Sequence, residues 1–390
     1  MSRHVDAPTT SGKATGPSSR WQKINRSLLV SGFLLLLLLP TLFFGHPGAA
    51  NQALKENRQL AAFPKASLFF FQYLEKWYAD HFGGRANLIY YGARWQMDWI
   101  GIPGNRNVLL GRDQWLFYDQ YYRPGQALFA DFRGKARFTA DQLARIRAQL
   151  LETQRALARC NIAFYLVMPP DKQTIYPDMM PFRKTDGTQT RADQLAAVLR
   201  PESELHFVDL RPSLQRARRQ EALPVYFKTD THWNALGAFH GVQALTDAMR
   251  ADGRVDLGPS RDAYKVETRA HRGGDIAVSL LSLPDYFRDI EVTMTLPGNT
   301  AHPVDAGLLQ YRNPSVKGRL LLYGDSFSEL MLPFLAQRFG QVTAIRRAQI
   351  DDADITAARP DVVVLEVLER LLGGLEAGPL RLPTCDPARR

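Results

Sequence analysis

The chain has 390 residues, 45% of them hydrophobic and 11% aromatic, a composition that can bury a core and excludes a globally disordered protein. Its formal net charge is +10, of which +4 comes from residues 1–26, where five basic residues stand against one aspartate. The remaining charge is spread along the chain and forms no dense basic stripe, so we expect no nucleic-acid partner.

The spacing of the cysteines and the absence of nucleotide motifs argue against a metal or cofactor. The two cysteines, Cys160 and Cys385, form neither a CxxC pair nor a zinc-binding spacing. A disulfide between them is possible in an oxidising compartment. Cys160 otherwise suits a small buried position, because it lies between a helical pattern and an apolar run. The sequence has no GxGxxG, Walker A or HExxH motif, so we expect no cofactor and no bound metal.

The first helix expected in the chain is a membrane anchor. Residues 27–44 carry no charge over 18 positions, and a helix of that length rises about 27 Å, close to the hydrocarbon thickness of a bilayer. The basic residues before it indicate an N-terminus in the cytoplasm. We therefore predict a cytoplasmic tail over residues 1–26, a single-pass signal anchor over residues 27–45 in the inner membrane, and the rest of the chain in the periplasm. A signal peptide cut after Ala50 is the alternative, and it leads to the same compartment.

Three regions are expected beyond the anchor. Residues 46–105 form a linker followed by an aromatic-rich segment that is helical over 67–100. A catalytic domain extends over residues 106–375 and opens with a hairpin over 108–118, where two apolar runs flank a turn. A loose, proline-rich tail occupies residues 376–390.

Strands and helices alternate through the expected catalytic domain. Thr139 and Gln142 can form a capping box for a helix that ends at Cys160, and Asn234 can cap another helix. This alternation predicts an α/β fold, with a parallel sheet covered by helices on both faces. Strands are expected over residues 162–168, 206–210, 319–323, 342–345 and 362–367, with a further helix over 328–339.

The turn GDSFS, residues 324–328, supplies a candidate nucleophile. In an open parallel sheet, sites form beyond the carboxyl ends of the strands, and this turn directly follows an expected strand. A serine in that position is exposed, and the amides of a following helix can stabilise an oxyanion. The competing interpretation is structural, because Ser326 and Glu329 also have the spacing of a capping box.

The segment TDTHW, residues 229–233, supplies a candidate base and its orienting carboxylate. Residues two apart in extended backbone face the same side, about 6.6 Å apart, so Asp230 could bond one imidazole nitrogen of His232 while the other faces a nucleophile. Among the eight histidines, only His232 has an aspartate two positions before it. The competing interpretation is an Asp/Thr turn with a structural histidine. Together, Asp230, His232 and Ser326 could fill the three roles of a catalytic triad.

These motifs resemble a known family. TDTHW and GDSFS, in that order, are specific to the alginate O-acetylase family of AlgJ and AlgX, a branch of the SGNH-hydrolase-like superfamily. The segments NRQLA at 57–61, GRDQWLF at 111–117 and PPDK at 169–172 also match. With an N-terminal anchor and no room for the C-terminal carbohydrate-binding module of AlgX, the chain is more similar to AlgJ.

The resemblance implies specific residues and partners. It assigns the triad to Asp230, His232 and Ser326, in a chain order opposite to that of the parent superfamily, so the usual oxyanion partners have no clear match. Trp233 and Gly274 are the candidate substrate-binding residues. The resemblance further implies a membrane-bound O-acyltransferase as the acetyl donor and a polysaccharide as the acceptor, either alginate or another exopolysaccharide.

Three functions stay open at this point. The first is O-acetyl transfer to an exopolysaccharide in the periplasm, through an acetyl-serine intermediate, and this is the function we expect. The second is hydrolysis of polysaccharide acetyl esters by the same triad, with water in place of the sugar hydroxyl. The third is a non-catalytic scaffold of a polysaccharide-modification complex, against which the presence of all three triad residues argues.

Overall fold

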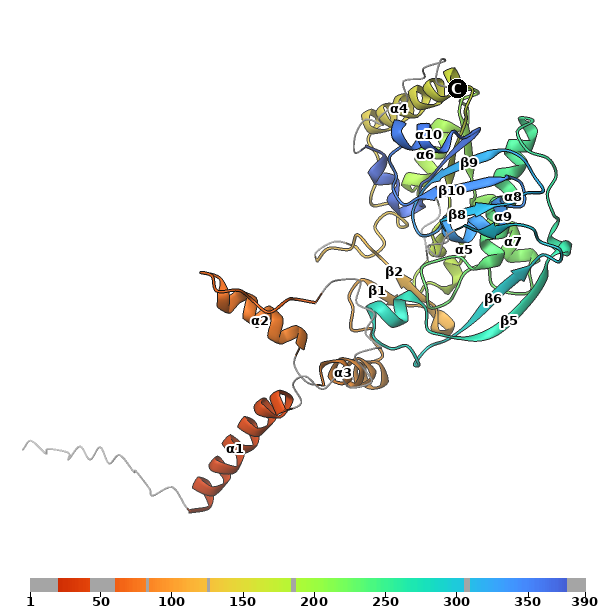
Figure 1. Cartoon of the computed structure of the whole chain (residues 1–390). Coiled ribbons are helices and arrows are strands. Elements are labelled where there is room, and N and C mark those ends of the chain that lie inside the picture. The colour runs from red at the N-terminus through yellow and green to blue at the C-terminus, as the bar shows by residue number, and fades with distance from the viewer. Residues whose placement is uncertain are drawn as a thin grey trace, which may run out of the picture. The chain divides into compact units, whose positions relative to one another are not determined.

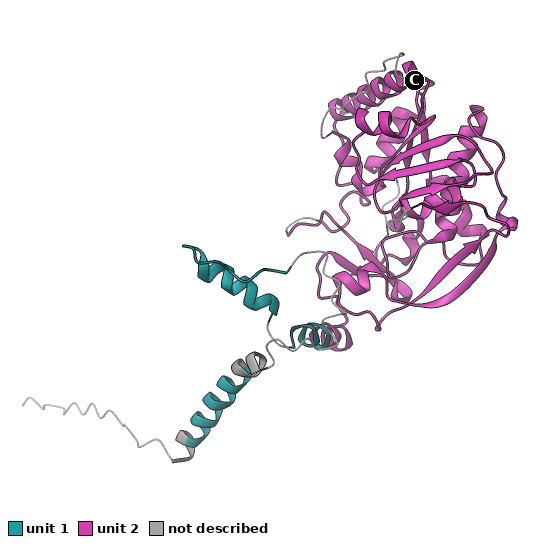
Figure 2. Cartoon of the chain, in the orientation of Figure 1, with its two compact units in different colours: residues 1–91 teal, residues 92–390 magenta. Residues whose placement is uncertain are grey.

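The structure is a computed structural model that describes residues 20–42, 60–81, 84–124, 127–183, 187–304 and 309–376. The chain divides into two compact units, residues 1–91 and residues 92–390 (Figure 2). The second unit contains the sheet and every candidate site residue, so its fold is what positions the site.

The first unit is helical over much of its described length. It contains α1 (Arg20–Leu42) and α2 (Phe70–His81), and α3 (Arg85–Ile100) begins in it and ends in the second unit. The helices α2 and α3 correspond to the helical segment expected over residues 67–100. Among the residues that the structure describes, no helix is both long and apolar enough to cross a membrane. Residues 43–59, with the end of the expected anchor and most of the expected linker, lie outside the described residues.

A seven-stranded sheet forms the centre of the second unit (Figure 1). Five successive strands run parallel, and the last two pair antiparallel at one edge. The expectation of a wholly parallel sheet is therefore wrong at this edge. In spatial order the strands are β4 (His206–Asp209), β3 (Ala163–Met168), β11 (Val362–Glu366), β9 (Arg319–Tyr323), β10 (Gln341–Ile345), β8 (Gln310–Arg312) and β7 (His302–Pro303). At this edge, the two short strands β7 and β8 are joined by a short connection, so they can pair with each other only in antiparallel orientation.

Helices cover both faces of the sheet, as the sequence predicts. Successive side chains of β3 point to opposite faces: Tyr165 packs in one buried cluster with residues of α7 and α8, and Phe164 packs in the other with residues of α4 and α6. Burial on both faces explains the unbroken apolar run of β3. The covering helices are α4 (Ala140–Arg159), α6 (Arg191–Leu199), α7 (Arg211–Gln220) and α8 (Ala235–Ala251).

Two helix starts predicted from the sequence are present. Thr139 and Gln142 form a complete capping box at the start of α4. The side chain of Asn234 accepts the amide hydrogens of Leu236 and Gly237 at the start of α8. The expected hairpin also forms, as β1 (Val108–Leu110) and β2 (Leu116–Tyr118).

One predicted helix is wrong. In place of a continuous helix over residues 328–339, the chain makes a 3-10 turn, η6 (Glu329–Met331), and a four-residue helix, α9 (Leu332–Leu335). Pro333 has no amide hydrogen to continue a helix from the preceding turn, so it lies in the first turn of α9. Ser326 is therefore followed by a compact turn and not by a long helix whose dipole could act on it.

The sequence analysis missed an antiparallel ribbon formed by β5 (Lys265–Arg272) and β6 (Arg288–Thr295). Most side chains of β5 are exposed and polar, so this strand lacks the alternation of a half-buried one. The connection between the two strands contains a π-helical turn, η5 (Ile276–Leu280), and reaches the candidate site. The remaining short elements are η2 (Arg112–Gln114), α5 (Lys172–Ile175), η3 (Pro177–Met179), η4 (Arg261–Ala263), α10 (Asp352–Ala358) and η7 (Glu369–Glu376).

Cysteine and terminal predictions are only partly covered by the structure. Cys160 is buried at the end of α4, as expected, and no cysteine among the described residues is free. Cys385 and the expected loose tail beyond Glu376 lie outside the described residues. The sequence left a disulfide between the two cysteines open; Cys160 is disulfide-bonded, and its partner lies outside the described residues.

Candidate active site

The segment that carries Asp230 and His232 lies between α7 and α8 and does not end a strand. Tyr226 and Trp233 form a single antiparallel bridge, and the amide of Phe227 donates to the carbonyl of His232 over 3.3 Å, which closes a bend. The expectation of extended backbone beyond a strand is therefore wrong here. The amide of His232 donates to Asp230 Oδ1 over 2.9 Å, so the aspartate shapes the turn as well as facing the imidazole.

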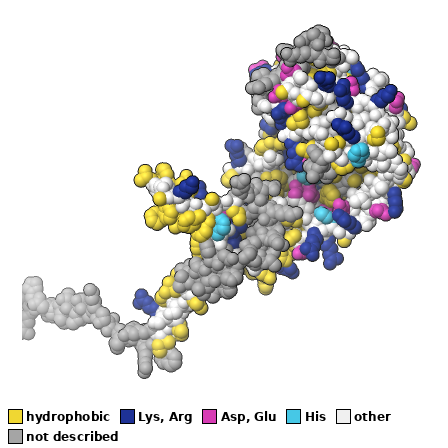
Figure 3. Space-filling view, in the orientation of Figure 1, with side chains coloured by type: hydrophobic (Ala, Val, Ile, Leu, Met, Phe, Trp, Pro, Cys, Tyr) yellow, Lys and Arg dark blue, Asp and Glu magenta, His cyan; other side chains and the backbone are white. Residues whose placement is uncertain are grey.

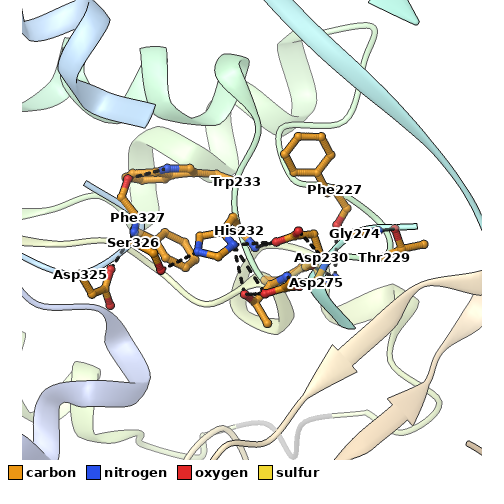
Figure 4. A network of polar contacts seen from close by, with 12 residues as sticks. Phe227, Thr229, Asp230, His232, Trp233, Gly274, Asp275, Asp325, Ser326 and Phe327 are labelled. Carbon is orange, nitrogen blue, oxygen red and sulfur yellow. Dashed lines mark hydrogen bonds and ion pairs between the residues drawn. The ribbon is translucent and has the colours of Figure 1, made fainter. Parts of the chain in front are cut away.

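His232 lies within hydrogen-bonding distance of both other predicted triad side chains, Asp230 and Ser326 (Figure 4). His232 Nδ1 lies 2.6 Å from Asp230 Oδ1, and His232 Nε2 lies 2.7 Å from Ser326 Oγ. With the proton on Nδ1, the imidazole donates to the carboxylate and accepts from the serine hydroxyl. In this arrangement a histidine can take a proton from a serine that attacks a carbonyl carbon.

The connection between β5 and β6 packs against Asp230. The backbone amide of Asp275 donates to Asp230 Oδ2 over 2.8 Å. A Cβ added to Gly274 would lie 2.4 Å from Asp230 Cβ, so only glycine fits there. The Gly274 amide donates to Thr229 Oγ1 over 2.8 Å, and the amide and hydroxyl of Thr229 both donate to Asp289. Gly274 thus supports the Asp230 loop, and its amide is occupied rather than directed at a substrate.

A buried lysine holds the same loop. Lys172 is only 3% exposed, and its Nζ donates to the carbonyls of Phe227, Lys228 and Asp230 over 3.2, 3.0 and 2.6 Å. Burial lowers the pKa of Lys172 to about 8, against the opposing effect of nearby aspartates, so the ammonium is still charged at neutral pH. One cation therefore satisfies three carbonyls of the bend that carries Asp230.

The carboxylate of Asp275 places a second negative charge beside the imidazole. It accepts the amide of Thr231 over 2.7 Å and the hydroxyl of Thr231 over 2.6 Å, and it lies 3.7 Å from His232 Nδ1. Within the described residues, Asp230, His232 and Asp275 could hold a cation, because their ligand atoms lie within 4.8 Å of one another. The same atoms are hydrogen-bonded in the triad and the Thr231 turn, so a cation would compete with those contacts.

The charges of this cluster influence one another. Burial favours neutral His232, but the hydrogen bond and charge of Asp230 and the charge of Asp275 raise the pKa of His232 above its usual 6.5. Burial also opposes ionisation of Asp230, yet the hydrogen bond and charge of His232 hold the pKa of that carboxyl well below its usual range. Burial and the charge of Asp230 raise the pKa of Asp275. The site therefore stabilises the imidazolium that forms when His232 takes a proton.

The turn that carries Ser326 is held by its own residues and by neighbouring segments. Asp325 Oδ1 accepts the amide of Phe327 over 2.8 Å, and Ser328 Oγ donates to the Asp325 carbonyl over 2.6 Å. From distant segments, Glu366 Oε2 at the end of β11 accepts the Asp325 amide over 3.0 Å, and the Ile345 carbonyl accepts the Gly324 amide over 3.2 Å. Local and distant hydrogen bonds together fix the backbone that presents the serine.

Two predictions at this end of the site need correction. Trp233 is fully buried and donates its Nε1–H to the carbonyl of Phe327 over 3.1 Å, so it connects the two loops and has no surface for a substrate. The alternative role of Ser326 as a helix cap is also wrong. Its hydroxyl bonds to His232, and η6 begins after Ser328.

Two neighbouring cavities share Tyr121, and Ser326 lines one of them. One, of about 520 Å³, is lined by Ser326 and by residues from the ends of β10 and β11. The other, of about 500 Å³, is lined by Tyr118, Tyr122 and Arg370 among others, and Tyr121 lines both. Figure 3 shows Lys and Arg side chains dispersed over the visible face of the second unit, with acidic side chains among them. The first cavity therefore gives room for a ligand group beside the serine, whereas none of the three triad residues lines the second.

A family model described as "SGNH hydrolase-like domain, acetyltransferase AlgX" matches residues 108–347. The chain belongs to this family. The matched AlgX-type domain contains both triad segments, and the resemblance seen in the sequence is confirmed.

Named relatives agree with this family. The chain is 28% identical to the probable alginate O-acetylase AlgJ of Pseudomonas aeruginosa over 242 residues, which are 58% of this chain and 56% of that protein. It is 26% identical to the probable alginate O-acetylase AlgJ of Pseudomonas putida over 207 residues, 53% of this chain and 49% of that protein. The chain thus spans about half the length of the curated relatives it matches. Bacillus cereus PatB1 shares the fold, at 16% identity and a TM-score of 0.50, over 70% of this chain and 99% of that structure.

Proposed function

We propose that this protein is an O-acyltransferase that moves an acetyl group onto a hydroxyl of an exopolysaccharide, alginate or another, through an acetyl-serine at Ser326. The observation that carries the proposal is the hydrogen-bonded series Asp230, His232 and Ser326. Its occurrence inside an acetyltransferase family domain favours acyl transfer over other uses of the same three side chains.

The first half of the reaction loads the serine. Ser326 Oγ attacks the acetyl carbonyl while His232 Nε2 takes the hydroxyl proton, and Asp230 stabilises the resulting imidazolium. As the carbon–oxygen bond to the donor breaks, His232 returns that proton to the departing oxygen. The products are acetyl-Ser326 and the deacylated donor.

The second half transfers the acetyl group to the polymer. A sugar hydroxyl gives its proton to His232 Nε2 and attacks the carbonyl of acetyl-Ser326, and the bond to Ser326 Oγ breaks. His232 returns the proton to Ser326, so the triad is restored. Water in the place of the sugar would give the esterase reaction, and a small acetyl ester therefore serves as a test substrate.

The proposed setting is the periplasm. The apolar segment over residues 27–45 would anchor the chain in the inner membrane, and a membrane-bound O-acyltransferase would deliver the acetyl group to the periplasmic face. Anchoring would raise the effective concentration of the catalytic domain near that donor. A reporter that fluoresces only in the cytoplasm, fused to the C-terminus, should stay dark, and a bright fusion would reject this topology.

The polymer itself gives the decisive test. A strain that carries Ser326→Ala in place of the wild-type chain should secrete exopolysaccharide without O-acetyl groups, whereas the matched variant Ser328→Ala should leave acetylation in place. Higher acetylation in the Ser326→Ala strain would instead identify the protein as an esterase. Unchanged acetylation would support a scaffold role.

A further inference from the structure

Aliphatic side chains line a large part of the cavity beside Ser326. It lies at the carboxyl ends of β9, β10 and β11, between α4 and η7. Its aliphatic lining comes from three segments: Ile146 and Leu150 in α4, Leu365 in β11 with Val367 just after it, and Leu371 and Leu375 in η7.

Four charged residues, Asp325, Glu366, Arg346 and Arg347, also line the cavity. Glu366 is buried, and one of its oxygens accepts the Asp325 amide. Burial, and then the charge of Asp325, raise the pKa of Glu366 well above its usual value. Arg346 and Arg347 are exposed and pair with Glu329 and Asp354, which places their charges at the rim.

The cavity is much larger than an acetyl group requires. Its volume is about 520 Å³, whereas an apolar cavity of about 150 Å³ is enough to hold benzene. Acetyl contributes a single methyl group beyond its carbonyl carbon. Because Ser326 lies in the wall, a group bonded to the carbonyl carbon that Ser326 attacks can extend into this space.

We propose that the cavity is the acyl-binding site and that it accepts linear acyl chains several carbons longer than acetyl. The inference rests on the proposed function, since it takes Ser326 as the nucleophile. Ser326 Oγ bonds the acyl carbon, the alcohol leaves with the serine proton by way of His232, and the aliphatic chain lies against α4 and η7. Water or a sugar hydroxyl then takes the acyl group, as in the acetyl reaction.

The test is the dependence of turnover on acyl length, with the full-length chain in detergent and 4-nitrophenyl acetate, butyrate and hexanoate as substrates. Rates are corrected with Ser326→Ala for hydrolysis that does not involve the site. Each methylene buried in the cavity should raise kcat/KM by up to about fourfold. A profile that falls from acetate to hexanoate would overturn the inference while leaving acetyl transfer intact. The absence of Ser326-dependent turnover of every ester would reject the proposed function and this inference together.

A cavity-filling variant locates the effect. Ala348 is exposed and lines the cavity, so Ala348→Trp should lower the ratio of hexanoate to acetate turnover at least tenfold. The matched control is Ala357→Trp, at an exposed position of α10 that does not line the cavity, and it should leave the ratio unchanged. An equal ratio in both variants would show that long acyl chains bind elsewhere and would contradict the proposal.

Discussion

The loop that carries Asp230 and His232 and the turn that carries Ser326 are supported in different ways. The histidine loop is held mainly by groups from distant parts of the chain, namely the buried Lys172 and Asp289 and the partly exposed Asp275. The serine turn combines hydrogen bonds among its own residues with contacts from Ile345, Glu366 and Trp233. The base therefore depends mainly on tertiary contacts, whereas the nucleophile has a local motif as further support, and substitutions should separate the two.

Asp230→Asn should have the largest effect. An amide cannot orient the imidazole as the carboxylate does, and the loss in kcat for small acetyl esters should be about 10⁴-fold. In the wild type, kcat/KM should fall as the pH drops through the raised pKa of His232, because protonated His232 cannot accept the serine proton. Asp230→Asn removes the main cause of that raised pKa, so the fall of kcat/KM on the acid side of the pH profile (its acidic limb) should move to lower pH.

The matched control for Asp230→Asn is Asp285→Asn, at a half-exposed aspartate outside the site. Both variants should be assayed over the same pH range. A loss of less than tenfold in Asp230→Asn, with an unmoved acidic limb, would contradict the triad.

Lys172→Met should come next, and it tests the distant support of the histidine loop. It leaves three partly buried carbonyls without their shared donor, so the free energy of unfolding should fall by about 3 kcal/mol. The bend that carries Asp230 should loosen, with a loss in kcat of about tenfold or more. Chemical denaturation and ester hydrolysis measure the two effects, with the exposed Lys265→Met as control. Wild-type stability in Lys172→Met would refute this support.

Trp233→Phe should have an intermediate effect, because it breaks the one hydrogen bond that joins the two loops through the indole. The carbonyl of Phe327 would lose its donor in a buried setting, at a cost of about 1–2 kcal/mol of stability. Thermal unfolding measures this loss, and Trp99→Phe, on the exposed side of α3, provides the comparison. If Trp233→Phe lost activity without any loss of stability, a direct substrate contact would have to be reconsidered.

Ser328→Ala should have the smallest effect. It removes one hydrogen bond, from Ser328 Oγ to the Asp325 carbonyl, so stability should fall by about 1 kcal/mol and ester turnover should stay within about threefold of wild type. Denaturation midpoints and initial rates check both values. A loss of activity larger than that of Ser326→Ala would mean that the nucleophile has been wrongly assigned.

The difference between the two loops also explains what the sequence could reveal. The central strands were predictable because strands buried on both faces, such as β3, have unbroken apolar runs. The triad candidates were predictable because each lies in a short motif. The ribbon β5–β6 and the edge strands β7 and β8 were missed, since they are polar or very short.

The supports of the histidine loop could not be inferred from local patterns. Lys172 lies in the segment PPDK, which was identified only by its match to the family. The residues next to it in sequence do not predict a buried cation that binds the carbonyl of Asp230. Gly274 was predicted to bind substrate, whereas its lack of a side chain allows close packing against Asp230. The bend at residues 227–232 likewise depends on these tertiary contacts, which explains why extended backbone was expected there.

The order of strands in the sheet has a consequence for how the chain matures. Among the residues that the structure describes, β11 is the last strand in sequence, yet it lies between β3 and β9 and pairs with both. All three triad residues are therefore synthesised before the strand that joins the two halves of the sheet. Pairings between segments so far apart form slowly, and incomplete sheets expose edges that aggregate. A chain truncated before Val362 would contain Asp230, His232 and Ser326 but not the strand that joins the two halves of the sheet, so activity should appear only after β11 has been synthesised.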